Sequence, residues 1–195
     1  MRLVFLPFLL IAHLFRSDLA SYTRMVDQVS ASIVRVTFDL EDGAHTCSGV
    51  VVSPNHILTA YHCVGDEMSV DGAPAVLRKS DNRTDLALLS AVSPRPALAI
   101  RKTIAQRYEP LTGIGYAFSW SALTALHVHA VLVNHQPTPH KSPGLVVQFE
   151  YISGMSGGPV VDRAGKLVGI VQWGASGLGY GVGSDTIKDF LAGSL

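Results

Sequence analysis

Alternating apolar and polar positions predict short β-strands along most of the chain. The first such run covers residues 31–38, and residues 41–43 end it with a turn. Comparable runs cover residues 48–52, 56–60, 68–70, 75–77 and 86–89 in the first half, and residues 111–115, 126–133, 144–149, 159–161, 167–173 and 179–182 in the second. Short strands at this spacing are typical of a β-barrel or a β-sandwich.

One helix and one long connection interrupt the strands. Residues 184–191 begin with Ser184, an N-cap residue, and place Ile187, Phe190 and Leu191 at helical spacing. The stretch from residue 93 to residue 110 has no clear periodicity. We interpret it as the connection between two lobes that share one core.

The amino-terminal segment has a different pattern. Residues 3–14 are apolar except for Pro7 and His13, and Arg2 precedes them. Twelve residues are too few to span a membrane but suit the apolar part of an export signal. Ala20 suits a cleavage site, whereas Asp18 does not, so a buried or interfacial amphipathic helix is the alternative.

These patterns predict a division of the chain into three parts. Residues 1–20 form a signal or membrane-anchor segment, and residues 1–16 are the part expected to associate with a membrane. Residues 21–98 form an amino-terminal lobe and residues 99–195 a carboxy-terminal lobe. The chain is expected to be monomeric.

Composition narrows the class of protein. Lys and Arg number 15, as do Asp and Glu, so the net charge is zero and nucleic acid is not an expected partner. Apolar residues make up 48% of the chain, which excludes disorder. Two cysteines exclude a Cys-only zinc site, and the histidines at positions 127, 129, 135 and 140 lack a Cys or carboxylate to complete a metal set. We therefore expect no metal and no cofactor.

A serine between glycines is the first candidate for chemistry. Ser156 lies within residues 154–159, where glycines permit unusual backbone angles and a close approach of a ligand to the main chain. The N–H groups of Gly154 and Ser156 could then stabilise an oxyanion. A plain glycine-rich turn is the alternative interpretation of this segment on its own.

A histidine and an aspartate complete the candidate set. His62 follows the predicted strand over residues 56–60, and Asp85 directly precedes the strand over residues 86–89. Each residue alone has an ordinary structural explanation. A nucleophilic serine needs a base and benefits from an acid that orients the base, so the three together predict nucleophilic catalysis.

With these motifs the chain resembles the chymotrypsin/trypsin-like serine proteases, especially their compact bacterial and viral members. Residues 59–63, 85–89, 154–159 and 167–174 carry the resemblance, which extends over about residues 29–191. It implies an all-β fold of two antiparallel six-stranded β-barrels with a short C-terminal helix and the site between the barrels. It also implies that Ser156 attacks the scissile carbonyl, His62 transfers the proton and Asp85 orients the imidazole.

The same resemblance suggests residues that bind substrate. Gln172, Trp173 and Gly174 would offer backbone groups to an extended peptide, and Trp173 would form a wall of the cleft. A core aromatic is the alternative for Trp173. Glu150 lies where related enzymes carry the acid that attracts a basic side chain, although it could instead face solvent.

The two cysteines give an indication of the cellular compartment in which the protein works. Cys47 and Cys63 correspond to a pair that relatives bridge across the loop carrying the base. A bridge requires an oxidising compartment, which implies a secreted, periplasmic or membrane-anchored protein. Two reduced, buried cysteines are the alternative.

One departure from the family pattern concerns activation. Met155 stands where trypsin-like zymogens have an aspartate that pairs with a newly cut amino terminus. We therefore expect a site that forms without processing, in a serine endopeptidase that acts on proteins or peptides through an acyl-enzyme. A catalytically silent binding protein and an acyl transferase or esterase are the two alternatives.

Overall fold

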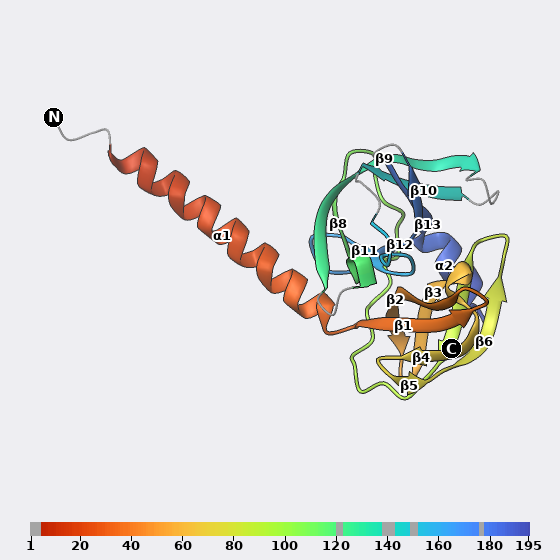
Figure 1. The fold of residues 1–195 in the computed structure, drawn as a ribbon. Helices are drawn as coiled ribbons and strands as arrows, with labels where there is room; N and C mark the ends of the chain where they lie inside the picture. The colour runs from red at the N-terminus through yellow and green to blue at the C-terminus, as the bar shows by residue number, and fades with distance from the viewer. Residues whose placement is uncertain (1–4, 120–122, 138–142, 149–151, 176–177) are drawn as a thin grey trace.

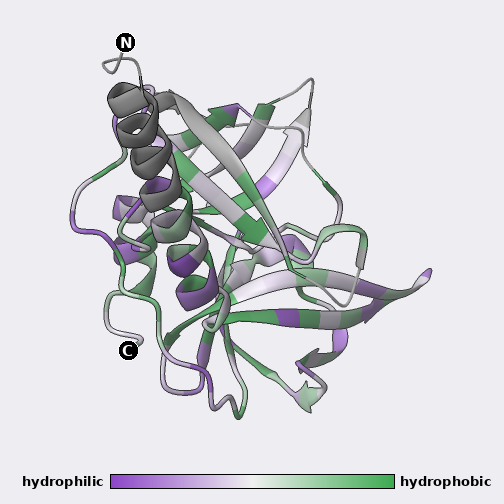
Figure 2. Cartoon of the chain, turned by 90° about the vertical axis from the view of Figure 1, so that its left-hand side faces the viewer, coloured by the Kyte–Doolittle hydropathy of each residue, from purple (hydrophilic) through white to green (hydrophobic). Residues whose placement is uncertain are grey.

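The chain folds into two antiparallel β-sheets, preceded by a long helix and followed by a short one (Figure 1). The computed structural model describes residues 5–119, 123–137, 143–148, 152–175 and 178–195. Hydrophobic stretches run along the strands of both sheets (Figure 2), as the alternating sequence pattern predicts.

The first sheet is built from the first half of the chain. Its strands are β1 (Ile33–Leu40), β2 (Gly43–Ser53), β3 (His56–Ala60), β4 (Asp66–Val70), β5 (Ala73–Pro74), β6 (Val76–Asp81) and β7 (Leu86–Ser90). Their order is β5-β4-β1-β2-β3-β7-β6, and each neighbouring pair is antiparallel. This arrangement places the end of β3 beside the start of β7, because Ala60 pairs with Leu86.

The second sheet closes into a barrel. Its strands are β8 (Pro110–Gly115), β9 (Thr124–Pro137), β10 (Pro143–Gln148), β11 (Pro159–Val161), β12 (Leu167–Ala175) and β13 (Leu178–Gly183). The order around the barrel is β10-β13-β12-β11-β8-β9. Closure leaves no free outer strand and fixes the short β11 between two neighbours.

The described core has three parts. One apolar cluster fills the first sheet, around Val36 and Ile57, and a second fills the barrel, around Leu111 and Val168. The third joins the two sheets and both helices, with members Met25, Val29, Ile33, Val50, Val52, Leu58, Leu86, Leu88, Leu98, Ile114, Tyr116, Val161, Leu167, Ile170, Val182, Ile187, Phe190 and Leu191. This shared core fixes the position of one sheet relative to the other.

The amino-terminal helix α1 (Phe5–Ser30) projects from the body and docks only by its last turns (Figure 1). Met25 and Val29 are buried in the shared core, and a Cβ on Gly165 would come within 3.1 Å of Val29. Among the described helices, none is both long and apolar enough to cross a membrane. The sequence pattern did not predict that helix continues from residue 21 to residue 30.

The carboxy-terminal helix α2 (Ser184–Leu191) has the predicted bounds but a different cap. Gly183 occupies the N-cap position and provides no side-chain hydrogen bond, whereas the Ser184 hydroxyl donates to the Thr103 carbonyl at 3.2 Å. Lys79 of β6 donates to the carbonyl of Phe190 and lies 5.0 Å from the centre of its ring. The helix is thereby tied to the first sheet.

The connection between the sheets is held by an ion-pair network. The Arg101 guanidinium lies 2.5 Å from Glu109 and 3.4 Å from Asp162, and all three side chains are largely buried. Its hydrogen bond to Glu109 is the main reason that the pKa of this carboxyl lies below its ordinary value of 4.5. Arg101 N–H also donates to the carbonyl of Leu167 in β12, so the connection is fixed to the barrel.

The structure confirms the expected fold: it is mostly β, with two curled antiparallel sheets and a short C-terminal helix, consistent with a chymotrypsin-like double barrel. The first sheet has seven strands where six were expected, because a two-residue strand, β5, adds to its edge. The two sheets use residues 33–90 and 110–183. The proposed lobe boundary between residues 98 and 99 remains a prediction.

Candidate active site

His62 lies on a single turn of 3-10 helix, η1 (Tyr61–Cys63), directly after β3. Its backbone N–H donates to Oδ1 of Asp85 at 2.9 Å, and its ring Nδ1 lies 2.8 Å from Oδ2 of the same carboxylate. An ionised carboxylate only accepts hydrogen bonds, so the ring proton sits on Nδ1 and the lone pair on Nε2. The side chain of His62 is 45% exposed and that of Asp85 is 5% exposed. The pair thus combines a buried acid with an accessible base.

The Asp85 backbone is held in an unusual conformation. Its φ is 50°, in the left-handed region that a side chain rarely adopts. The Tyr61 N–H and the Gln172 side-chain amide both donate to its carbonyl, at 3.1 and 3.0 Å. The same Gln172 amide also donates to the carbonyl of Thr84. These bonds aim the carboxylate at His62 and stabilise the strained turn.

Ser156 lies on a loop of the barrel that faces this pair. Its hydroxyl is buried and donates to the Gln172 carbonyl at 2.8 Å. Its own carbonyl lies 3.9 Å from the sulfur of Cys63, the residue next to His62. The structure therefore brings the loop with Ser156 against the turn with His62, although the two are 94 residues apart in sequence.

The glycines around Ser156 are required by space. Gly154 and Gly157 have φ of 92° and 80°. A Cβ on Gly157 would lie 2.1 Å from the Ser48 carbonyl and 2.2 Å from the Thr59 hydroxyl, so no other residue fits. In the part of the chain that the structure describes, the Gly154 N–H donates no hydrogen bond. It is one of the two amides expected to bind an oxyanion.

Met155 points into the barrel. It is fully buried and packs within the barrel cluster, near Leu111 and Val160. Its N–H donates to the carbonyl of Ile152 at 3.2 Å. The position that holds an aspartate in trypsin-like zymogens therefore carries an apolar side chain with apolar neighbours.

Residues Gln172, Trp173 and Gly174 lie at the end of β12. The pairing with β13 shifts register between Val171 and Trp173, so Gln172 sits in a bulge and its carbonyl reaches Ser156. Trp173 stacks on Tyr180, with ring centres 4.1 Å apart, and is neither fully buried nor fully exposed. On the other side of β12, pairing with β11 ends at Ile170. Among the described strands, this edge has no partner at residues 173–174.

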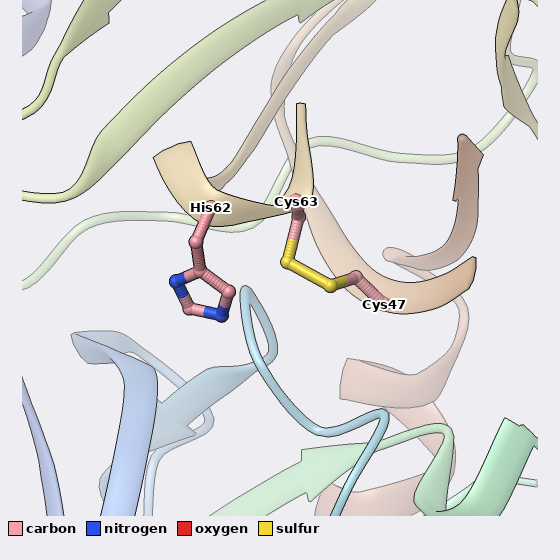
Figure 3. Close-up of side chains that lie close together, drawn as sticks. All are labelled: Cys47, His62 and Cys63. Atoms are coloured by element: carbon pink, nitrogen blue, oxygen red, sulfur yellow. A yellow bond between two sulfur atoms is a disulfide. The ribbon is translucent and has the colours of Figure 1, made fainter. Parts of the chain in front are cut away.

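The cysteines form a disulfide, as the resemblance implies. Cys47 of β2 and Cys63 of η1 have Cα atoms 6.0 Å apart, and Figure 3 shows the bond beside the ring of His62. The ligand atoms of His62 and both cysteines lie within 4.8 Å of one another. Sulfur atoms joined to each other are not thiolates, so this group does not offer a metal a normal ligand set.

Some candidate residues cannot be placed. Glu150 lies outside the described residues, and so do the side chains of the histidines at positions 127, 129, 135 and 140. Other contacts of the site were not anticipated. Ser48 and Phe118 both bond to the Ser156 loop, but in the sequence Ser48 is only one polar position in a predicted strand, and Phe118 acts through its backbone.

Comparison with protein families identifies the relatives of this site. Residues 47–170, more than half of the chain, match the family described as the trypsin-like peptidase domain. The chain belongs to this family. A trypsin-like peptidase is a serine-type hydrolase, in agreement with the bond between His62 and Asp85 and with the contact between the neighbouring Cys63 and Ser156. Comparison with curated proteins gives no significant match.

Several solved bacterial proteases share the fold of this trypsin-like peptidase. The active form of the Rv3671c protease from M. tuberculosis has a TM-score of 0.78 and 22% identity, over 86% of this chain and 82% of that chain. A serine endoprotease from Yersinia pestis has a TM-score of 0.76 and 22% identity, over 88% of this chain and 65% of that one. An HtrA-type protease, AlgW, with a tripeptide has a TM-score of 0.78 and 22% identity, over 88% and 62%. At these identities the likeness establishes the fold.

Proposed function

We propose that this trypsin-like peptidase is a serine endopeptidase that cleaves peptide bonds through an acyl-enzyme. The observation that carries the proposal is the contact between Nδ1 of His62 and the buried carboxylate of Asp85, on a turn that touches the Ser156 loop. This contact supports an imidazole whose Nε2 is a proton acceptor.

The first half-reaction would proceed as follows. The Ser156 hydroxyl turns its proton from the Gln172 carbonyl to Nε2 of His62, and Oγ bonds to the substrate carbonyl carbon. The oxyanion is bound by the N–H groups of Gly154 and Ser156. The C–N bond then breaks as Nε2 returns the proton to the leaving amine. Asp85 remains ionised and stabilises the imidazolium.

The second half-reaction would use water. His62 takes a proton from water, the oxygen attacks the acyl carbon, and the ester bond to Ser156 breaks as its Oγ regains the proton. The unpartnered edge at Trp173 and Gly174 supports the binding of an extended peptide as an added strand, with Trp173 beside it.

A fluorophosphonate probe and peptide turnover test the proposal. We expect the probe to label the unmodified full-length chain and not Ser156→Ala, and we expect His62→Ala to lose labelling and turnover. His45→Ala is the matched control, because His45 is a histidine of β2 whose ring pairs with Asp42 and stacks on Phe38. No labelling of the unmodified chain would refute the proposal. Turnover of simple esters without turnover of peptides would instead assign an esterase or acyl transferase.

Two finer proposals concern substrate and location. We infer a preference for Lys or Arg before the cut if Glu150 contacts the substrate, and Glu150→Gln with a peptide library tests this. An unchanged preference would remove Glu150 from the site. The disulfide supports a protein outside the reducing cytoplasm, with residues 1–16 as the proposed signal or membrane contact. Cell fractionation that detects only cytoplasmic protein would contradict this location.

A further inference from the structure

The carbonyl groups of residues 153–156 each accept a hydrogen bond from within the protein. Each of the four carbonyls has its own donor atom. The four bonds run from Phe118 N–H to Ser153 at 2.6 Å, from the Ser48 hydroxyl to Gly154 at 2.8 Å, from Gly158 N–H to Met155 at 2.9 Å, and from Ser48 N–H to Ser156 at 2.8 Å.

Because the peptide unit is planar, each of these hydrogen bonds also sets the direction of an N–H group. In a trans peptide the C=O and N–H bonds point to opposite sides, so fixing each carbonyl also fixes the following N–H. The Ser153 and Met155 carbonyls therefore orient the N–H groups of Gly154 and Ser156. These are the two proposed oxyanion donors. The N–H groups of Met155 and Gly157 donate to the carbonyls of Ile152 and Val171.

Ser48 provides two of the four bonds, although it belongs to the other sheet. It lies in β2, is fully buried, and contacts the loop through both its backbone N–H and its hydroxyl. The hydroxyl donates to Gly154 and accepts from the Tyr116 N–H at 2.8 Å. Both capacities of the hydroxyl are used, so its position is fixed from two sides.

The space around Ser48 suits a serine and little else. A Cβ on Gly115 would lie 2.8 Å from the Ser48 hydroxyl, and one on Gly158 would lie 3.3 Å from the Ser48 Cβ. The Ser48 carbonyl in turn accepts from the Thr59 hydroxyl at 2.7 Å. A larger side chain would displace the loop, and a side chain without a hydroxyl would leave the Gly154 carbonyl and the Tyr116 N–H unpaired.

We propose that Ser48 is a positioning residue for the oxyanion hole: its hydroxyl holds the Gly154 carbonyl and so fixes the Gly154–Met155 peptide, which joins the two peptides that carry the oxyanion donors. The inference rests on the proposed peptidase function. Its effect is on catalysis and not on substrate binding, because the neighbouring N–H groups of Gly154 and Ser156 stabilise the oxygen mainly as charge develops on it.

Ser48→Ala, compared with Ser184→Ala, tests the inference. Ser184 is a second fully buried serine whose hydroxyl donates to a backbone carbonyl, but it lies at the start of α2. For Ser48→Ala we expect kcat on a library-selected peptide and the fluorophosphonate labelling rate to fall about 10- to 100-fold, with KM within about twofold. For Ser184→Ala we expect both rates to stay within about twofold of the unmodified chain. Ser48→Gly, which also lacks the hydroxyl, provides a second variant, and the melting temperature of each variant checks folding.

The outcomes separate the two proposals. An unmodified chain that neither labels nor turns over peptide would refute the peptidase function itself. An active unmodified chain with equal kcat in Ser48→Ala and Ser184→Ala would overturn the role of Ser48 alone. A fall in kcat that follows the loss of melting temperature equally in both variants would also overturn it, since Ser48 would then be merely structural.

Discussion

The backbone and the ring of His62 both bond the carboxylate of Asp85, at 2.9 and 2.8 Å. The two oxygens therefore cannot rotate without breaking one bond, and the imidazole has a defined tautomer. We expect Asp85→Asn to lower kcat by about ten-thousandfold, the loss known for this change in the general serine-protease template, because an amide would favour the wrong tautomer. Steady-state kinetics on a peptide substrate measures this. A loss below about tenfold would contradict the assigned role.

The disulfide next to His62 gives a second prediction. Replacing Cys47 and Cys63 together by serine should reduce the free energy of unfolding by about 3 kcal/mol, because the bond closes a loop of 16 residues. Activity should fall as well, since η1 carries both Cys63 and His62. Urea unfolding and kinetics with and without dithiothreitol measure both effects. The chain has two cysteines, so the double variant should not respond to the reductant; a response in it would indicate another cause.

Gln172 is expected to position two members of the site. Its amide donates to the carbonyls of Thr84 and Asp85, and its carbonyl accepts from Ser156. Gln172→Ala would leave the Thr84 carbonyl unpaired and the Asp85 carbonyl with the Tyr61 N–H alone, at a cost of about 1 to 3 kcal/mol, and should lower kcat at least about tenfold. Gln172→Glu should be worse, because a buried carboxylate would face those carbonyls.

The exposed Gln28 on α1 provides the matched control for the charge change. Gln28→Glu should leave both stability and kcat unchanged within error. The same kcat in Gln172→Glu and Gln28→Glu would show that Asp85 keeps its orientation without the Gln172 amide.

Because Met155 replaces the aspartate of trypsin-like zymogens, we expect the protein to be active without cleavage near its amino terminus. The full-length chain should label with fluorophosphonate before any cut near its amino terminus, which N-terminal sequencing of the labelled protein can verify. Met155→Leu should cost less than about 1.5 kcal/mol, because it conserves volume. Met155→Asp should cost about 3 to 5 kcal/mol, as a buried charge without a partner. Labelling that appears only after cleavage would disprove this prediction.

The Arg101–Glu109 pair predicts sensitivity to acid. The pKa of Glu109 is lowered in the folded state, so its contribution to stability is complete above the ordinary value of 4.5 and is lost as the pH falls through the lower, folded-state pKa. Glu109→Gln should therefore reduce stability at neutral pH, by about 1 to 2 kcal/mol, and progressively less below pH 4.5. Melting temperatures from pH 7 to pH 3 measure the difference. A constant difference across that range would contradict the linkage.

The sequence predicted the parts of this protein whose signals are local. Strands such as β3 and β7, and the bounds of α2, follow from apolar periodicity, and His62 and Asp85 stand at strand ends where loops begin. The sequence did not predict helix over residues 21–30, because apolar positions such as Met25 and Val29 are buried only by tertiary contacts in the shared core. The Ser48 contacts were missed for a similar reason. They join β2 to a loop 106 residues away, and no local pattern encodes such a bond.

The attachment of α2 to the first sheet has a consequence for the timing of synthesis. Ile187, Phe190 and Leu191 belong to the shared core that also contains Val50, Leu58 and Leu86, and Lys79 binds the end of the helix. A ribosome-bound chain that lacks these residues has an incomplete shared core between the two sheets that carry His62 and Ser156. We therefore expect a nascent chain to gain peptidase activity only after residues 184–191 have left the ribosome.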